Sequence, residues 1–356
     1  MNILILYNEF NGAYGSVYDF QNEMIKTIKE KDCIYVSKSV KDTLEILRKY
    51  PIDFSIGIGT FYQYSNNVPI YEITKIHHYQ WIIDNPLKMN IDEKSLFVTY
   101  IFIDRDFIYN LRKIYNLPLF IPLGFNRKFN RTDIKKKKEG IVFCGQIKDC
   151  EMNRKKIFKT LKEKKVEQFI HEYETKLDES LEKSFKKYFG DFTLSEQKKI
   201  FRLCNTYFRT KKRKIVIESI KDYPVYIIGD VLDDKISKKN NVHILSKMPY
   251  MKTWNEVTQY MFSLNINPNF HNAIHDRIIR SIQCGTLPIT ENGKWCYENF
   301  GDLIPYYDYR TLSIEDIIMN YDYKKYTENI YSLQSKAGKF DWTNALKKIK
   351  ENYNEI

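Results

Sequence analysis

The residues best suited to chemistry gather in one short stretch near the middle of the second half of the chain. A polar loop and the start of the helix after it contain two histidines, an acid and an arginine: His271, His275, Asp276 and Arg277. The backbone N–H groups and the dipole at the start of such a helix attract anions. Arginine and protonated histidine add positive charge there. The pattern therefore predicts a site for phosphate groups.

The segments around this loop alternate between strand-like and helix-like patterns. Val242–Leu245, Phe262–Pro268 and Leu287–Thr290 are short apolar or β-rich runs that predict strands. Met251–Met261 is amphipathic and predicts a helix, with apolar residues at helical spacing: Trp254, Val257, Tyr260 and Met261. A second helix begins at His275, and Gly285 stands where it should end. A loop between a strand end and a helix start is where parallel α/β sheets bind ligands.

The rest of the chain predicts two α/β halves joined by a polar linker. Strands are expected in the first half at Ile3–Tyr7, Asp32–Ser37, Asp53–Gly59, His77–Ile83, Ser95–Phe102 and Leu119–Pro122, with helices at Val17–Lys29 and Val40–Lys49. The second half restarts with the strand Gly140–Gly145, continues through a mostly helical stretch at 167–220 whose last helix is Arg213–Ile220, and then forms the strand Val225–Gly229. The domains predicted are 1–125, a linker at 126–139, 140–335, and a C-terminal helix at 336–356.

The run LNINPNFHNAIHDRIIRSIQCGTLPITE resembles the donor-binding region of GT-B glycosyltransferases. It is most similar to the CgeB-like (spore maturation protein-like) branch of the glycosyl transferases group 1. GIVFCG at 140–145 and VYIIGD at 225–230 resemble the first strand and a later strand of the same domain. The resemblance implies an α/β GT-B fold, with two Rossmann-like domains whose parallel sheets face a central cleft. It also implies that the C-terminal helix packs back on the N-terminal domain.

The activity implied by this resemblance is metal-independent transfer of a sugar from a UDP- or other NDP-sugar. The acceptor would be a hydroxyl on a cell-surface glycan, protein or lipid. The chain would then be a hexosyltransferase-type enzyme of bacterial surface glycosylation, and it would need no cofactor. His275 would act at the leaving diphosphate, and the other donor-site candidates are Gly145, Gly229, Asn267, His271, Asp276 and Arg277. Tyr250 is a candidate for the nucleobase and Glu291 for the ribose.

The chain departs from many group 1 relatives at the Glu-x7-Glu pair that reads the ribose. The matching positions here are Asn272 and Arg280, and neither is acidic. The CgeB-like branch often lacks this pair, so the departure fits the branch but leaves ribose recognition and the stereochemical outcome open.

Asp84 is the leading candidate for the base that removes the acceptor proton. It follows the predicted strand His77–Ile83 and precedes a Pro turn, a position that favours function in parallel sheets but also suits a simple turn cap. The related enzymes have a similar W-x-x-D-x-P segment. Glu9 and Asp19 are the next candidates for this base. Gly12 and Gly15 belong to a first loop that the resemblance places on the acceptor side.

No metal site is predicted. Asp104 and Asp106 form the D-x-D triplet used by metal-dependent glycosyltransferases of another fold, but they precede a predicted helix at Phe107–Tyr115, where Asp is a common cap. His77 and His78 are adjacent on a strand and would face opposite sides. The six cysteines form no C-x-x-C pair, so free thiols are expected.

The composition of the chain limits its expected cellular location and its expected partners. The chain has 356 residues, 43% of them hydrophobic, and a formal net charge of +12. It has no long apolar run for a transmembrane helix and no signal-like start, so a cytoplasmic location is expected. Much of the basic charge alternates with acids, which favours solvated helix faces over nucleic-acid binding. Peripheral attraction to an anionic membrane, a non-catalytic nucleotide-sugar-binding scaffold and an NDP-sugar epimerase of GT-B architecture stay open as alternatives.

Overall fold

The chain divides into two compact units in this computed structural model. Unit 1 comprises Met1–Arg127 and Lys339–Ile356, and unit 2 comprises Lys128–Gly338. The residues described are 1–7, 15–29, 32–59, 64–66, 68–88, 91, 95–110, 116–126, 136–160, 164–267 and 270–356. Glu9, Gly12 and most of the predicted linker lie outside them. No helix among the described residues has the length and apolar character needed to span a bilayer.

The sheet of unit 1 is parallel, and its spatial order is β2-β1-β3-β6-β7-β8. Its strands are β1 (Asn2–Leu6), β2 (Cys33–Ser37), β3 (Phe54–Ile58), β6 (His77–Ile82), β7 (Val98–Phe102) and β8 (Leu119–Phe120). A small antiparallel pair, β4 (Tyr64–Ser65) and β5 (Val68–Pro69), lies apart from it. The central strands β3 and β7 are buried along their whole length, as near-continuous apolar runs in a covered parallel sheet should be.

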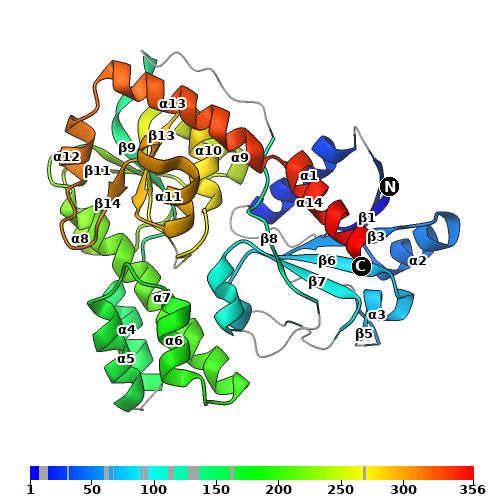
Figure 1. Ribbon diagram of the computed structural model, residues 1–356. Helices are drawn as coiled ribbons and strands as arrows, with labels where there is room; N and C mark the ends of the chain where they lie inside the picture. Colours follow the sequence, from blue (N-terminus) through cyan, green and yellow to red (C-terminus); the bar gives the residue numbers. More distant parts are fainter. Residues whose placement is uncertain are drawn as a thin grey trace. The chain divides into compact units, whose positions relative to one another are not determined.

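The helices of unit 1 come from both ends of the chain. They are α1 (Ser16–Ile28), α2 (Val40–Lys49), α3 (Ile70–Thr74) and α14 (Trp342–Glu355). Figure 1 shows α14 beside α1, and the indole N–H of Trp342 donates to Glu23 on α1 at 3.2 Å. A Cβ at Gly124 would lie 2.5 Å from the Trp342 ring, so the glycine makes room for it.

The sheet of unit 2 is also parallel, with the spatial order β11-β10-β9-β12-β13-β14. Its strands are β9 (Lys138–Cys144), β10 (Val225–Ile228), β11 (Val242–Leu245), β12 (Tyr260–Asn265), β13 (Leu287–Glu291) and β14 (Tyr306–Tyr307). In chain order this is 3-2-1-4-5-6, the Rossmann arrangement, whose direction of winding reverses between β9 and β12.

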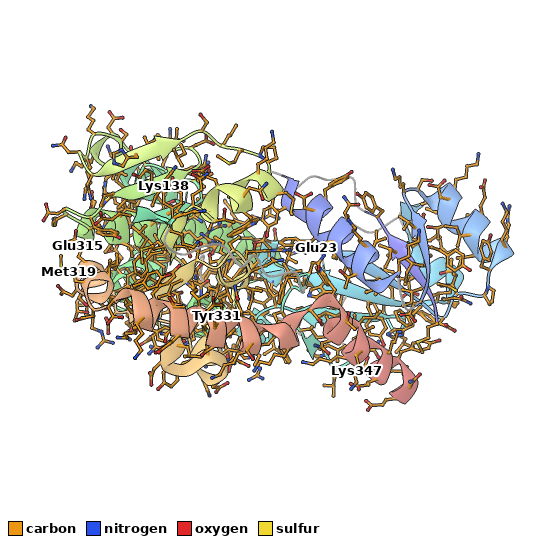
Figure 2. The ribbon with its side chains drawn as sticks, turned by 90° about the horizontal axis from the view of Figure 1, so that it is seen from above. Glu23, Lys138, Glu315, Met319, Tyr331 and Lys347 are labelled. Carbon is orange, nitrogen blue, oxygen red and sulfur yellow. The ribbon has the colours of Figure 1, made fainter. Side chains whose placement is uncertain are left out.

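A helical layer, residues 150–219, stands beside this sheet (Figure 1). It consists of α4 (Cys150–Thr160), α5 (Lys164–Glu174), α6 (Leu181–Phe189) and α7 (Leu194–Ser219). Aromatic rings form its core, and Phe169 alone contacts five of them: Tyr173, Phe185, Tyr188, Phe189 and Phe208. A capping box of Thr193 and Glu196 starts the long α7. Beyond the end of α7, the backbone N–H groups of Lys221, Asp222 and Tyr223 all donate to the side chain of Glu315, which is labelled in Figure 2.

The other helices of unit 2 pack on its sheet or follow it. They are α8 (Asp234–Ser237), α9 (Tyr250–Val257), α10 (Asp276–Gln283), α11 (Lys294–Phe300), α12 (Ile314–Met319) and α13 (Tyr323–Ala337). Gly285, at φ +65°, follows α10 in the left-handed conformation expected of a helix-ending glycine.

Three predicted elements differ in the structure. The helix expected at Met251–Met261 ends at Val257. Tyr260 and Met261 instead begin β12, because this segment pairs with β9 through Tyr260 and Phe262. The segment Arg213–Ile220 is not a separate helix but the end of α7. In place of a helix from Phe107 the chain forms a 3-10 helix at Arg105–Asn110, and residues 111–115 are outside the described part.

Candidate active site at the carboxyl edge of the second sheet

The candidate site lies where β9 and β12 end side by side. Winding reverses between these neighbouring strands, and the carboxyl ends of strands at such a reversal are where open α/β sheets bind ligands. Gly145 follows β9, and Ile266 and Asn267 follow β12. The chain then turns into α10, whose first residue is Asp276 and whose N-cap is His275. The predicted strand-loop-helix arrangement is therefore present at this edge.

His275 and Asp276 form a close pair at the start of α10. Nδ1 of His275 lies 2.6 Å from Oδ1 of Asp276 and 3.2 Å from the backbone nitrogen of Arg277. The same Nδ1 also lies 3.2 Å from Nε of Arg277. The ring also stacks on Phe270 with a centroid distance of 5.5 Å. The imidazole is thus held in one orientation.

Tyr250 holds the other oxygen of the same carboxylate. Its hydroxyl, on the first turn of α9, donates to Oδ2 of Asp276 at 2.8 Å. Asp276 therefore positions His275 instead of facing an anion, which a carboxylate would repel. Arg280 is buried with its guanidinium 5.8 Å from the Tyr250 ring centroid. These contacts give Tyr250 and Asp276 supporting roles.

Arg277 ties the two strand ends together. Its guanidinium donates to the carbonyl of Cys144 at 3.0 Å and to the carbonyl of Ile266 at 3.3 Å. A third contact joins Nη2 to Nε2 of His275 at 3.2 Å. Arg277 is only 8% exposed, so this cation joins the ends of β9 and β12 from within the protein.

The surroundings of His275 keep its imidazole neutral. Burial and the Arg277 guanidinium lower the pKa of His275 to about 4, against the opposing effect of Asp276. Near neutral pH the positive charge at this edge is therefore carried by the arginines and by the start of α10. An anion bound beside the ring would favour its protonated form.

Two further arginines reach the site from α7, and the local sequence pattern predicted neither of them. Arg213 donates to the backbone carbonyl of Gln146, directly after Gly145. Its guanidinium lies 5.6 Å from the centroid of the Phe143 ring, and that of Arg277 lies 5.8 Å from the same ring. Arg209, one turn earlier, is close enough for its charge to lower the pKa values of His275 and Arg277. Their four-residue spacing was the signal for a shared helix face, but no local pattern showed which way that face points.

Glu291 at the end of β13 and Asn267 just beyond the end of β12 are hydrogen-bonded to each other. Oε1 of Glu291 accepts from the backbone N–H of Asn267 at 2.7 Å and from the Tyr309 hydroxyl at 3.2 Å. Oε2 accepts from Lys212 of α7 at 3.2 Å, and that lysine side chain is 4% exposed. The Asn267 side chain bonds the backbone of Phe270 and so closes its own loop. Both residues are thus engaged in holding elements together.

Gly145 and Gly229 allow two strand ends to pack closely. A Cβ on Gly229, where φ is +146°, would lie 2.5 Å from the carbonyl oxygen of Gly145. A Cβ on Gly145 would meet the Phe143 ring at 3.0 Å and the Arg213 guanidinium carbon at 3.6 Å. These glycines are required by packing within the protein. His271 lies in the loop before α10, and its backbone carbonyl is 3.3 Å from a Cβ placed on Gly293.

The remaining predicted candidates belong to unit 1. Asp84 follows β6, its side chain is 50% exposed, and Lys88 binds it at 3.2 Å. Gly15 is the N-cap of α1 at φ +83°, and Asp19 lies in the first turn of that helix.

The D-x-D triplet serves a local purpose. Asp104 is fully buried, and its Oδ1 accepts from the backbone N–H of Asp106 at 2.8 Å as the 3-10 helix begins. This is the capping role expected from the sequence. In the described part of the chain, no cluster of three or more His, Cys, Asp or Glu side chains could hold a metal ion. All six cysteines are free thiols, as expected.

Solved structures of similar fold are glycosyltransferases. AviGT4, involved in avilamycin A biosynthesis, matches with a TM-score of 0.56 and 7% identity over 99% of this chain and 97% of its own. An α-glucosyltransferase in complex with UDP-glucose and DNA gives 0.56 and 10% over 99% and 98%. HepE from Anabaena, in complex with UDP and glucose, gives 0.54 and 10% over the whole of both chains.

The chain has the GT-B fold. The match covers both units, each with its own parallel sheet, as the resemblance in the sequence implied. No protein-family model matches the sequence, and no curated protein matches it significantly.

Proposed function

We propose that this GT-B protein transfers a sugar from a nucleotide-activated donor, a UDP- or other NDP-sugar, to an acceptor hydroxyl. The observation that supports this most is the convergence of three arginines and the start of α10 at the carboxyl edge of the second sheet. This arrangement suits a diphosphate, because backbone N–H groups and guanidinium groups both bind phosphate oxygens. Two of the three structures of similar fold described above hold UDP or UDP-glucose.

In this proposal unit 2 binds the donor and unit 1 serves the acceptor. The diphosphate lies at the start of α10, between Arg209 and Arg213 on one side and His275 on the other. As the bond from the anomeric carbon to the phosphate oxygen breaks, negative charge grows on the leaving diphosphate. The arginines stabilise it, and His275 gains a proton more readily beside it. Asp276 and Tyr250 orient the ring, and Arg277 keeps β9 and β12 at the right separation.

The acceptor oxygen forms the new bond to the anomeric carbon and loses its proton to a base. Asp84 is our first candidate, because it is a half-exposed carboxylate at the carboxyl end of a central strand. Asp19 and Glu9 follow it, and Gly12 and Gly15 would border the same loop. We propose that no metal or other cofactor is needed, since the cationic side chains can offset the leaving-group charge.

The finer assignments are also proposals. They are hexosyl transfer, membership of the CgeB-like branch, action in the cytoplasm, and a surface glycan, protein or lipid as acceptor. Tyr250 and Glu291 are the sequence candidates for the nucleoside, but their contacts within the protein favour supporting roles. One neighbour of similar fold was solved with DNA, which adds nucleic acid to the acceptors worth testing.

Calorimetric titration with nucleoside diphosphates and nucleotide sugars, with and without Mg²⁺, tests the donor. We expect one nucleotide to bind without Mg²⁺, and His275→Ala to weaken it, while His243→Ala on the exposed face of β11 should not. Transfer is then tested by release of the nucleoside diphosphate from the bound sugar donor.

Three outcomes would contradict this assignment. If no nucleotide binds, the assignment of a donor site to this edge of the sheet is wrong. Binding without any turnover, even with water as acceptor, would favour the scaffold. Conversion of the sugar without an acceptor would favour an epimerase.

A further inference from the structure

Most of the net charge of the chain is carried by the helical layer. Residues 150–219 contain 19 Lys and Arg against 11 Asp and Glu, whereas the net charge of the whole chain is +12. Two thirds of the excess therefore lies in about one fifth of the sequence. Such a concentration points to an anionic partner with extended charge.

Four of these cations lie along one face of α7. Lys198, Arg202, Arg209 and Arg213 are separated by four, seven and four residues. This spacing returns to the same side of an α-helix, so the four side chains leave the helix within one stripe. At 1.5 Å per residue the stripe is about 22 Å long. We call these four residues the α7 stripe.

The inner end of the α7 stripe is the candidate active site. Arg213 bonds the carbonyl of Gln146 there, and the charge of Arg209 acts on His275. The outer end is at the surface, where Arg202 is exposed. The stripe therefore connects the donor site with the outside of the helical layer.

The neighbouring helix α4 also carries exposed cations. It packs along α7, and Asn153 donates to the Thr210 hydroxyl at 3.2 Å. Its outward residues are exposed and basic: Lys155, Lys156 and Lys159. Two neighbouring helices therefore offer two rows of cations, which suits a partner with many regularly repeated charges.

The helical layer lacks the apolar surface that a membrane would require. Helices that lie on membranes present large apolar side chains next to their basic ones. Among the described residues of this layer, Met152 is the one large apolar side chain that is exposed. The aromatic side chains instead form the buried core of the layer.

We infer that the α7 stripe and the basic face of α4 bind nucleic acid through its phosphodiester backbone. The bound strand presents an acceptor group to the donor held beside Arg209 and Arg213. The presentation of an acceptor rests on the proposed function, whereas nucleic-acid binding does not.

Fluorescence anisotropy with the full chain and a labelled 30-base-pair duplex tests the inference. Binding should weaken steeply as salt rises, because each phosphate contact releases condensed ions. Replacing Lys198 and Arg202 by Ala should weaken binding at least tenfold and lower the slope of log K against log salt by about 2. The matched control replaces the exposed residues Lys183 and Lys186 of α6 and should change affinity less than threefold.

Three results would overturn it: no salt-dependent binding to duplex or single strand, equal losses in both double variants, or tight binding to vesicles of anionic lipid with none to nucleic acid. Titration of the unaltered protein with UDP runs in parallel. Duplex binding without any nucleotide binding would leave this inference standing and refute the proposed function.

Discussion

The Arg277 guanidinium donates to the backbone carbonyl of Cys144 at 3.0 Å. This bond joins the start of α10 to the end of β9, two elements separated by more than a hundred residues in the chain. It places the buried cation at the reversal of the sheet, with His275 on its outer side. Hydrogen bonds therefore join Arg277, His275 and the end of β9 at this edge of the sheet.

Arg209 is expected to contribute directly to donor affinity. A charge-assisted hydrogen bond to phosphate is worth about 2 kcal/mol, so Arg209→Ala should weaken binding of UDP about thirtyfold. Lys211→Ala is the control on the same helix, because Lys211 pairs with Glu174 at 2.9 Å instead. Calorimetric titration measures both. Equal affinities for UDP in the two variants would show that Arg209 does not bind the donor.

Asp84→Asn should separate turnover from donor binding. Loss of a general base costs about a hundredfold or more in kcat, while affinity for the donor should stay within twofold. Lys88→Ala leaves the carboxylate in place and removes its ion-pair partner, so it should retain most of the turnover. Steady-state kinetics with a donor and its acceptor decide this. If Asp84→Asn keeps full kcat, the base is another residue.

The buried pair of Lys212 and Glu291 should matter for stability. Lys212→Met leaves the carboxylate without its cation and should lower the free energy of unfolding of unit 2 by about 3 kcal/mol. Adding Glu291→Gln should recover part of that loss, because the uncompensated charge is removed. Urea unfolding curves give the values. A Glu291→Gln variant of unchanged stability that no longer binds nucleotide would instead support the ribose role predicted from the sequence.

His78 should make unit 1 sensitive to acid. It is fully buried between Ser55 and Gln80, at 2.8 Å from each, and burial lowers its pKa to about 4 from the usual 6.5. As pH falls below about 6.5, the unfolded chain takes up this proton before the folded one does. The stability is therefore complete above 6.5 and lost as pH falls toward 4, with about 2 kcal/mol gone at pH 5.

His78→Gln removes the titrating group, so it should flatten the fall in stability between pH 7 and pH 5. The exposed His243 on β11 supplies the control His243→Gln, which should leave that fall unchanged. Denaturant titrations at the two pH values provide the comparison. An equally steep fall in His78→Gln would show that other groups cause the acid sensitivity.

Local patterns in the sequence were enough to predict the alternation of strands and helices and the start of α10. Mostly apolar runs form the five-residue strands β1, β3 and β7 because buried parallel strands need apolar side chains on both faces. The segment at Tyr260 was predicted wrongly as helix, because its helical spacing competes with pairing to β9. Its pairing partner, Lys138, lies 122 residues earlier, and no local window contains it.

The candidate site was likewise predicted in part from the local sequence, while the tertiary structure decided the rest. The residue types at His271, His275, Asp276 and Arg277 predicted an anion site from sequence alone, since a helix start creates one wherever it occurs. Tertiary structure decided their separate roles: Arg277 is buried against two strand ends, and Asp276 orients His275 with Tyr250. It also turned one face of α7 toward the site and so added Arg209 and Arg213. Side-chain direction depends on how a helix packs, which contacts distant in the sequence determine.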